Sequence, residues 1–246
     1  WVDLSPIAGF VKSAAYLPML LVMVVLTSAG LFKLNMHLGK PHRFYRGFYN
    51  LKMSPVSREI AGVSAFFTGL LGYSFFALFD NDFASFMQII FSLLSLLGLA
   101  LGGYFMYKLY RIPARPFWDH WQTATSFVAT GLTLGGSLLG VVALVFGAMT
   151  NDLTVLLATV ISFGVLLECI GLFGHAHDLK PANSEGAVSF YEQTTTYGKS
   201  YWLRNGLLVV SILLALSIVL SGTSSVAVFG VLVVLMLVAS IIGRAL

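Results

Sequence analysis

The sequence predicts an all-α protein, a bundle of transmembrane helices, and three observations lead to that prediction. Of the 246 residues, 58% are hydrophobic and only 10% are charged, whereas a soluble domain keeps about a quarter of its residues charged. The mean hydropathy is correspondingly high, at +0.89. The hydrophobic residues also gather in runs of about 20, the length that a helix needs to cross a hydrocarbon core about 30 Å thick. The class is therefore a polytopic helical membrane protein.

Seven such runs follow one another along the chain, and each is expected to be helical because unpaired backbone groups find no water inside lipid. They cover residues 14–35, 60–79, 84–107, 124–149, 153–173, 203–221 and 225–243. No connection is long enough to fold as a separate catalytic domain, so residues 1–246 are expected to form a single integral membrane domain. The longest connection, 174–203, has room for a short amphipathic or irregular segment.

Positive charge is distributed unevenly between the two ends of these spans. One end carries the N-terminal segment and the connections FDNDF, TNDL and SGTSS, and the other carries residues 36–58, 108–123, 174–203 and the C-terminus. Of the fourteen Lys and Arg residues, Lys12 alone falls at the first end and thirteen fall at the second. The positive-inside rule places the second end in the cytoplasm. It also accounts for the basic pI of 9.2 without a nucleic-acid partner.

Common signals of catalysis, haem and metal binding are missing from the sequence. There is no Gly-rich phosphate loop, no HExxH motif and no recognisable nucleophile arrangement. The single cysteine, Cys169, cannot build an Fe–S or zinc site. Haem ligation takes paired histidines from facing helices at membrane depth, but all five histidines lie at span ends or in loops. No haem, no metal site and no catalytic residue are expected in this chain.

The ionisable residues near the spans lie mostly at the second end, which carries thirteen of the fourteen cations and is called the basic end from here on. Placing an ionisable side chain near a span costs free energy, so these residues are candidates for a functional role. They are His37, Glu59, Asp119, His120, Glu168, His175, His177, Arg204 and Arg244. His37 closes the first predicted span and Glu59 opens the second, so a helical hairpin can bring the two together. An imidazole can hold a quinone carbonyl, and a carboxylate can move the protons that accompany electrons. The alternative is interfacial anchoring and helix capping, with Ser57 as the cap of a helix that begins near Glu59.

A second group of residues suggests a proton path. Glu168 lies seven residues before His175, so on a continuous helix they share a face about two turns apart. Together with Asp119 they form a candidate path toward the basic end. The alternative is a buried Glu168 that is satisfied by a neighbouring helix. The arginines of the basic connections can hold lipid phosphates or dock an acidic partner, and the sequence does not separate these roles. They are Arg43, Arg46, Arg58, Arg111 and Arg115.

Four stretches of the sequence are similar to a known family. HLGKPHRFYRGFYNLKMSPVSREIAG, residues 37–62, resembles the first long loop of the membrane anchor subunits of the dimethyl sulfoxide (DMSO) reductase family. That loop reads H-L-G-x-P-x-R, then a spacer, then S-x-E-I. Weaker matches are RPFWDHWQTATSFVATGLTLGGSLLG (115–140), YWLRNGLL (201–208) and IIGR (241–244). The resemblance runs in order from about residue 20 to the end of the chain.

The resemblance implies a prokaryotic inner-membrane anchor that exchanges electrons between menaquinone or ubiquinone and an Fe–S subunit. The molybdopterin and Fe–S clusters would belong to partner subunits, a catalytic and an electron-transfer subunit. The family's quinone-site histidine and glutamate fall on His37 and Glu59, and its loop arginine falls on Arg43. Family members usually have eight helices, so a further helix is expected before the span that ends in His37. The substrate class would be a sulfur oxyanion or an S- or N-oxide, as in sulfite oxidation or DMSO reduction.

Two points of the sequence bear on this interpretation. The charge bias places the quinone-site loop in the cytoplasm, whereas well-known family members work on the periplasmic side. Anchors of cytoplasm-facing sulfite-oxidising complexes fit the bias better. The competing class is a secondary transporter or channel, but transporters carry polar groups or broken helices near mid-membrane, and the span centres here are almost free of charge.

Overall fold

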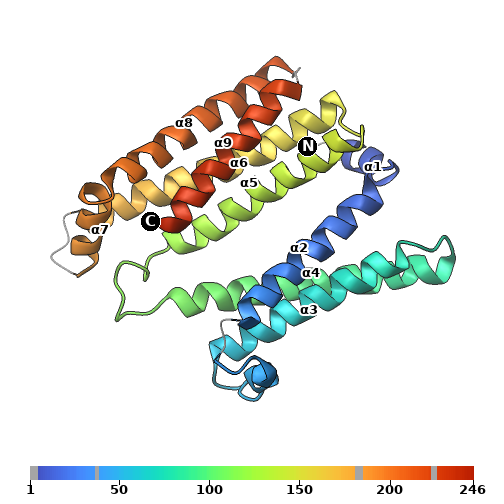
Figure 1. Cartoon of the computed structure of the whole chain (residues 1–246), viewed down its shortest axis with the longest axis horizontal. Coiled ribbons are helices and arrows are strands. Elements are labelled where there is room, and N and C mark those ends of the chain that lie inside the picture. The colour runs from blue at the N-terminus through green and yellow to red at the C-terminus, as the bar shows by residue number, and fades with distance from the viewer. Residues whose placement is uncertain (1–4, 37–38, 181–184, 223–225) are drawn as a thin grey trace. The chain divides into compact units, whose positions relative to one another are not determined.

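The computed structural model describes residues 5–36, 39–180, 185–222 and 226–246, and these residues form helices and short connections without a strand (Figure 1). Within this part of the chain, seven helices are long and apolar enough to cross a membrane. The predicted all-α transmembrane bundle is therefore confirmed. The helices are α1 Ser5–Val11, α2 Tyr16–Met36, the 3-10 helix η1 Pro41–Phe48, α3 Pro55–Phe76, α4 Asp82–Tyr110, α5 Gln122–Val145, α6 Asn151–Leu179, α7 Glu185–Thr195, α8 Gly198–Ser221 and α9 Val226–Ala245.

Each of the seven predicted spans corresponds to one long helix, but the connection predicted at 174–203 is largely helical. Helix α6 continues to Leu179, α8 already begins at Gly198, and α7 lies between them. The last turns of α6 are held by packing rather than by lipid, because His175 and Leu179 are both buried. Helix α7 occupies the part of this connection in which a short amphipathic or irregular segment was expected.

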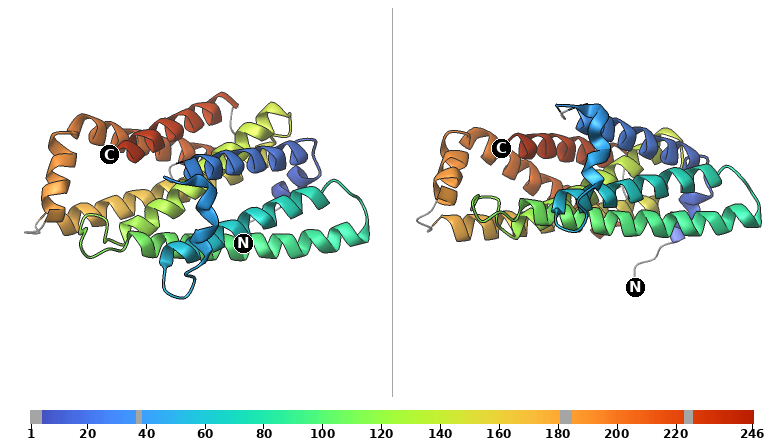
Figure 2. Two further views of the ribbon diagram at one scale, coloured as in Figure 1. Left: turned by 60° about the horizontal axis from the view of Figure 1, so that its bottom comes forward. Right: turned by 90° about the horizontal axis from the view of Figure 1, so that it is seen from below.

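The chain divides into two compact units, the described parts of residues 1–15 with 112–246, and residues 16–111. In the first unit, α5, α6, α8 and α9 pack as a closed group in which each helix contacts two of the others (Figures 1 and 2). Its core is apolar and centres on α6 and α9, where Ile161, Phe229 and Leu232 are fully buried. Helix α7 contacts the neighbouring parts of α6 and α8.

The second unit consists of α2, η1, α3 and α4, and a close pair of helices dominates it. Helices α3 and α4 lie side by side as an antiparallel hairpin in all views (Figures 1 and 2). Glycines allow the approach: a Cβ atom on Gly69 would lie 2.7 Å from the Phe91 carbonyl oxygen, and one on Gly98 would lie 2.7 Å from the Gly62 oxygen. Helix α2 joins them through the Tyr16 and Tyr73 hydroxyls, which are 2.5 Å apart. Small residues at a helix contact are the usual device inside lipid.

The glycine contact leads to a stability prediction. Replacing Gly98 with alanine should lower the free energy of unfolding by about 1–3 kcal/mol, because the new methyl group would press on the backbone of α3 rather than on a movable side chain. Gly103→Ala is the matched control, since nothing lies within 4 Å of a Cβ atom at Gly103 on the same helix. The measurement is the thermal unfolding midpoint in detergent. Equal midpoints for the two variants would contradict the close packing.

Candidate functional site

The connection between α2 and α3, residues 37–54, is called the basic loop. Its η1 segment, which carries Arg43, packs against the beginning of α3 in the second unit. Helix η1 contacts α3, and Gly47 lies against the end of the Ile60 side chain: a Cβ atom on Gly47 would lie 2.6 Å from the Ile60 Cδ1 atom. Arg58 secures the rest of the loop: its Nε atom donates to the Leu51 carbonyl at 2.7 Å, and its Nη2 atom donates to the Lys52 carbonyl. The basic loop therefore lies beside the residue that follows Glu59.

Glu59 lies in the second turn of α3, which corrects the capping alternative. The helix begins at Pro55, and its N-cap is Ser54, whose Oγ atom accepts from the Ser57 amide at 3.3 Å. Ser57 is therefore not the cap, because proline at the first helical position moves the start of the helix five residues before the predicted 60. Glu59 is too far along the helix for a capping bond, and the helix dipole acts mainly within the first turn.

The Glu59 side chain is half-buried, and no described residue offers it a hydrogen bond or an ion pair. A carboxylate at a membrane interface that has no partner among the described residues is available to an incoming group. Arg43 is exposed in η1, with a backbone that departs from helical geometry at φ −102° and ψ 16°. The structure thus brings the Arg43 loop and Glu59 to the same end of α3. His37 lies outside the described residues.

Asn35 is a polar group of this unit that the sequence interpretation missed. It lies in the last turn of α2, and its Oδ1 atom is buried without a hydrogen-bond partner in the described part of the chain. A buried, unpaired carbonyl oxygen costs about 1–3 kcal/mol, so it needs a donor. The signal was its position two residues before His37, an amide at the end of a mostly apolar run.

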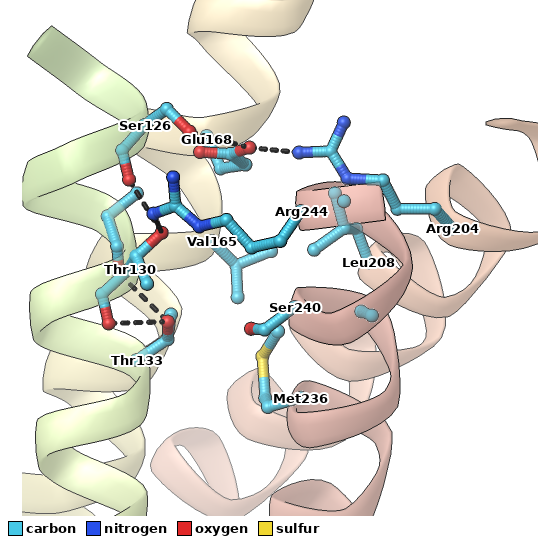
Figure 3. Close-up of a pocket in the computed structure, with 13 residues that line it drawn as sticks. Ser126, Thr130, Thr133, Val165, Glu168, Arg204, Leu208, Met236, Ser240 and Arg244 are labelled. Atoms are coloured by element: carbon cyan, nitrogen blue, oxygen red, sulfur yellow. Dashed lines mark hydrogen bonds and ion pairs between the residues drawn. The ribbon is translucent and has the colours of Figure 1, made fainter. Parts of the chain in front are cut away.

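The first unit holds a buried ion pair. Glu168 of α6 accepts a hydrogen bond from the Arg204 Nη2 atom of α8, and the two residues are only 7% and 8% exposed (Figure 3). Ser126 of α5 donates to the same Glu168 Oε1 atom at 3.4 Å. Glu168 is thus buried and paired with neighbouring helices through its Oε1 atom, as the alternative to the proton path predicted, but its Oε2 atom has no hydrogen-bond partner in the described part of the chain. At the end of α9, Arg244 donates to the Thr130 Oγ1 atom at 3.0 Å.

The other two residues of the candidate proton path lie elsewhere in this unit. His175 is buried on α6, as Glu168 is, but its Nε2 atom donates to the Phe117 carbonyl at 3.0 Å, and no described hydrogen bond joins it to Glu168. Asp119 is half-buried in the turn that follows Arg115, whose carbonyl its amide contacts at 3.0 Å. The structure therefore places His175 and Glu168 on the same helix without a hydrogen bond between them among the described residues.

His175 instead belongs to a cluster at the end of α6 that also contains His120, His177 and Asp178, and that we call the His175 group. The ring centre of His175 is 5.2 Å from that of His120, whose Nδ1 atom accepts from the Gln122 amide at 3.0 Å. The His120 Nε2 atom therefore carries the proton, and it donates to the Asp178 Oδ2 atom at 2.9 Å. His177 donates to the other Asp178 oxygen at 3.1 Å, and it is exposed while His175 is buried. The two histidines, two residues apart on α6, thus occupy different faces of the helix.

The buried ion pair leads to a second stability prediction. Arg204→Met should lower the free energy of unfolding by about 3–5 kcal/mol, because it leaves the Glu168 charge buried and uncompensated. The double variant Glu168→Met with Arg204→Met should recover most of that loss, since it removes both charges. The measurement is again the unfolding midpoint in detergent. A double variant as unstable as Arg204→Met alone would show that the pair does not determine stability.

Comparisons with known proteins found one family and one relative that this chain resembles in sequence. The family described as DMSO reductase anchor subunit (DmsC) matches residues 12–246. The chain is 32% identical over 133 residues to the C subunit of the anaerobic dimethyl sulfoxide reductase of Haemophilus influenzae, a match that covers 52% of this chain and 47% of that protein. The chain thus matches about half the length of this relative. No solved structure matches. Because the family match extends over nearly the whole chain, this protein belongs to the DMSO reductase anchor subunit family.

Proposed function

We propose that this chain is the quinone-exchanging anchor of a molybdopterin oxidoreductase complex. It passes electrons between a membrane quinone, menaquinone or ubiquinone, and an Fe–S partner subunit, which in turn serves a molybdopterin catalytic subunit. Family membership supports the anchor role, and the chain is an integral membrane protein with seven candidate spans in its described part. The finer proposal depends on the residues at the beginning of α3.

The observation that carries this proposal is the Glu59 carboxylate, half-buried and without a protein partner among the described residues, at the end of α3 where the basic loop packs. Oxidation of a quinol to a quinone releases two electrons and two protons. Glu59 accepts one of these protons and His37 the other, while the electrons leave to the partner's Fe–S cluster. Arg43 adds positive charge in the same loop, which packs against the beginning of α3. Asn35 supplies a hydrogen-bond acceptor from α2.

A purification experiment tests the proposed partners. The anchor should co-elute with molybdenum and iron when the complex is extracted in mild detergent, because neither element has a site in this chain under the proposal. The catalytic subunit is proposed to act on an S- or N-oxide or on a sulfur oxyanion. An intact preparation that contains neither metal would favour the transporter or channel class instead.

The orientation in the membrane is a further prediction. Labelling of single cysteines introduced at Tyr45 and Ser189 should place both on the cytoplasmic side, with Asp80 and Asp152 on the opposite side, because thirteen of the fourteen cations lie at the end of the spans that carries Tyr45 and Ser189. All four side chains are exposed, so reagent access does not limit the reaction. Cys169 is first changed to alanine. Labelling at position 45 by an impermeant reagent from outside the cell would reverse the assignment.

A further inference from the structure

A small cavity lies among α5, α6, α8 and α9 of the first unit, beside the buried ion pair (Figure 3). Its volume is about 30 Å³, and its polar lining consists of Ser126, Thr130, Thr133, Glu168, Arg204, Ser240 and Arg244. Three of the segments that carry the family resemblance meet here: 115–140 supplies the hydroxyls of α5, 201–208 supplies Arg204, and 241–244 supplies Arg244. The proposed quinone chemistry uses none of these residues.

Glu168, one of the residues that line this cavity, has a carboxylate oxygen without a hydrogen-bond partner in the described part of the chain. The Glu168 Oε1 atom is held by Arg204 and Ser126, but the Oε2 atom is buried and has no partner in the described part of the chain. The residue is only 7% exposed. A buried carboxylate whose second oxygen is unpaired is costly even when the first oxygen is in an ion pair, because the remaining lone pairs also need donors. The cavity lies beside this carboxylate and is the space in which a donor to it could be held.

The size of the cavity decides which donor fits. The volume of about 30 Å³ is the space open to the centre of a water-sized sphere. One water molecule needs about 10–15 Å³ of such space, so this cavity holds two, whereas a quinone ring or a phosphate group is far larger. A water also needs two to four polar partners, and the hydroxyls of Thr130 and Ser240 with the Arg244 guanidinium supply them beside Glu168. An apolar cavity of this size would stay dry, but this one is lined by charges.

We propose that this cavity is an internal water site, in which one or two waters donate to the Glu168 Oε2 atom and connect it to the surface beside Arg244. Arg244 is exposed at the end of α9 and lines the cavity, so water enters at the basic end of the unit. Gly243 leaves room for the Arg204 side chain of the ion pair, since a Cβ atom at Gly243 would lie 2.7 Å from the Arg204 Nε atom. Glu168 therefore meets water through this cavity and not through the His175 group.

Cysteine accessibility to silver ions tests the water site, because a thiol ionises and reacts in water but not in a dry or lipid environment. In a Cys169→Ala background, Ala239→Cys and Ser240→Cys place a thiol at the cavity wall. Val238→Cys and Ile241→Cys are the controls: they lie at the same depth on α9 but are 41% and 68% exposed on its outer side. The readout is protection from maleimide labelling after denaturation, in protein that remains monodisperse.

The two cavity thiols are expected to react with silver at least about tenfold faster than the two control thiols. Two cavity variants are used so that the loss of one through misfolding leaves the other as the test. Equal or slower reaction at the cavity positions overturns the water site. The result is independent of the quinone proposal, because it measures thiol reactivity in the first unit and not turnover.

Discussion

Glu59→Gln is expected to slow quinol-linked turnover on the order of 100-fold while the complex assembles normally. Glutamine keeps the shape of the side chain and can still accept a hydrogen bond, but it cannot take up a proton, and a lost proton-transfer group typically costs about 10²–10⁴-fold. Binding of a quinone-site inhibitor should survive the change. The measurements are the turnover per assembled complex with a soluble quinol and the affinity for the inhibitor.

Asp82→Asn is the matched control for this variant, since it also neutralises a carboxylate near a helix start, in the first turn of α4 at the other end of the α3–α4 hairpin. It should leave quinol turnover unchanged. If Glu59→Gln instead lowered the thermal stability and kept its turnover per complex, Glu59 would be structural. Asp119 and Glu168 would then be the next carboxylates to test.

His37→Ala is expected to slow quinol-linked turnover by at least about tenfold, again with normal assembly. The imidazole would no longer hold the quinone oxygen or accept the second proton, and alanine can do neither. The measurement is the rate of quinol oxidation per assembled complex, with KM determined separately from kcat so that weaker binding is distinguished from slower proton transfer.

His42→Ala is the control for His37, because His42 lies five residues further along the same basic loop and is exposed. It should retain quinol turnover. Quinol kinetics unchanged in His37→Ala, or slowed equally in both variants, would remove His37 from the site and leave Glu59 to work with another group of the loop.

Most of the fold could be predicted because a hydrocarbon environment leaves the sequence few options. Each of the seven apolar runs is one long helix, since lipid tolerates only segments that satisfy their own backbone. The ends were less predictable where packing or local chemistry takes over from lipid. Pro55 and Ser54 begin α3 before its apolar run, and buried His175 and Leu179 extend α6 beyond it.

The candidate residues were partly predictable for a similar reason. Costly ionisable groups in an apolar chain stand out, so Glu59, Glu168 and Arg204 were recognised from the sequence alone. Their partners were not, because the pairing of Glu168 with Arg204 depends on the rotation of α6 against α8, and neither helix has a strong periodic pattern that would determine it. The unpaired Asn35 oxygen could also be recognised only in the structure, because the sequence does not show which single atoms are buried.

Reduction of the partner's Fe–S clusters by quinol is the most direct test of the proposed quinone-exchanging anchor. The intact complex is mixed with excess quinol, and the reduced clusters are counted by electron paramagnetic resonance in the native complex and in Glu59→Gln. The proposal predicts that quinol reduces the clusters in the native complex and fails to do so on the same timescale in the variant, while dithionite reduces them fully in both. Cluster reduction by quinol at the same rate in both complexes, or in neither, would contradict it.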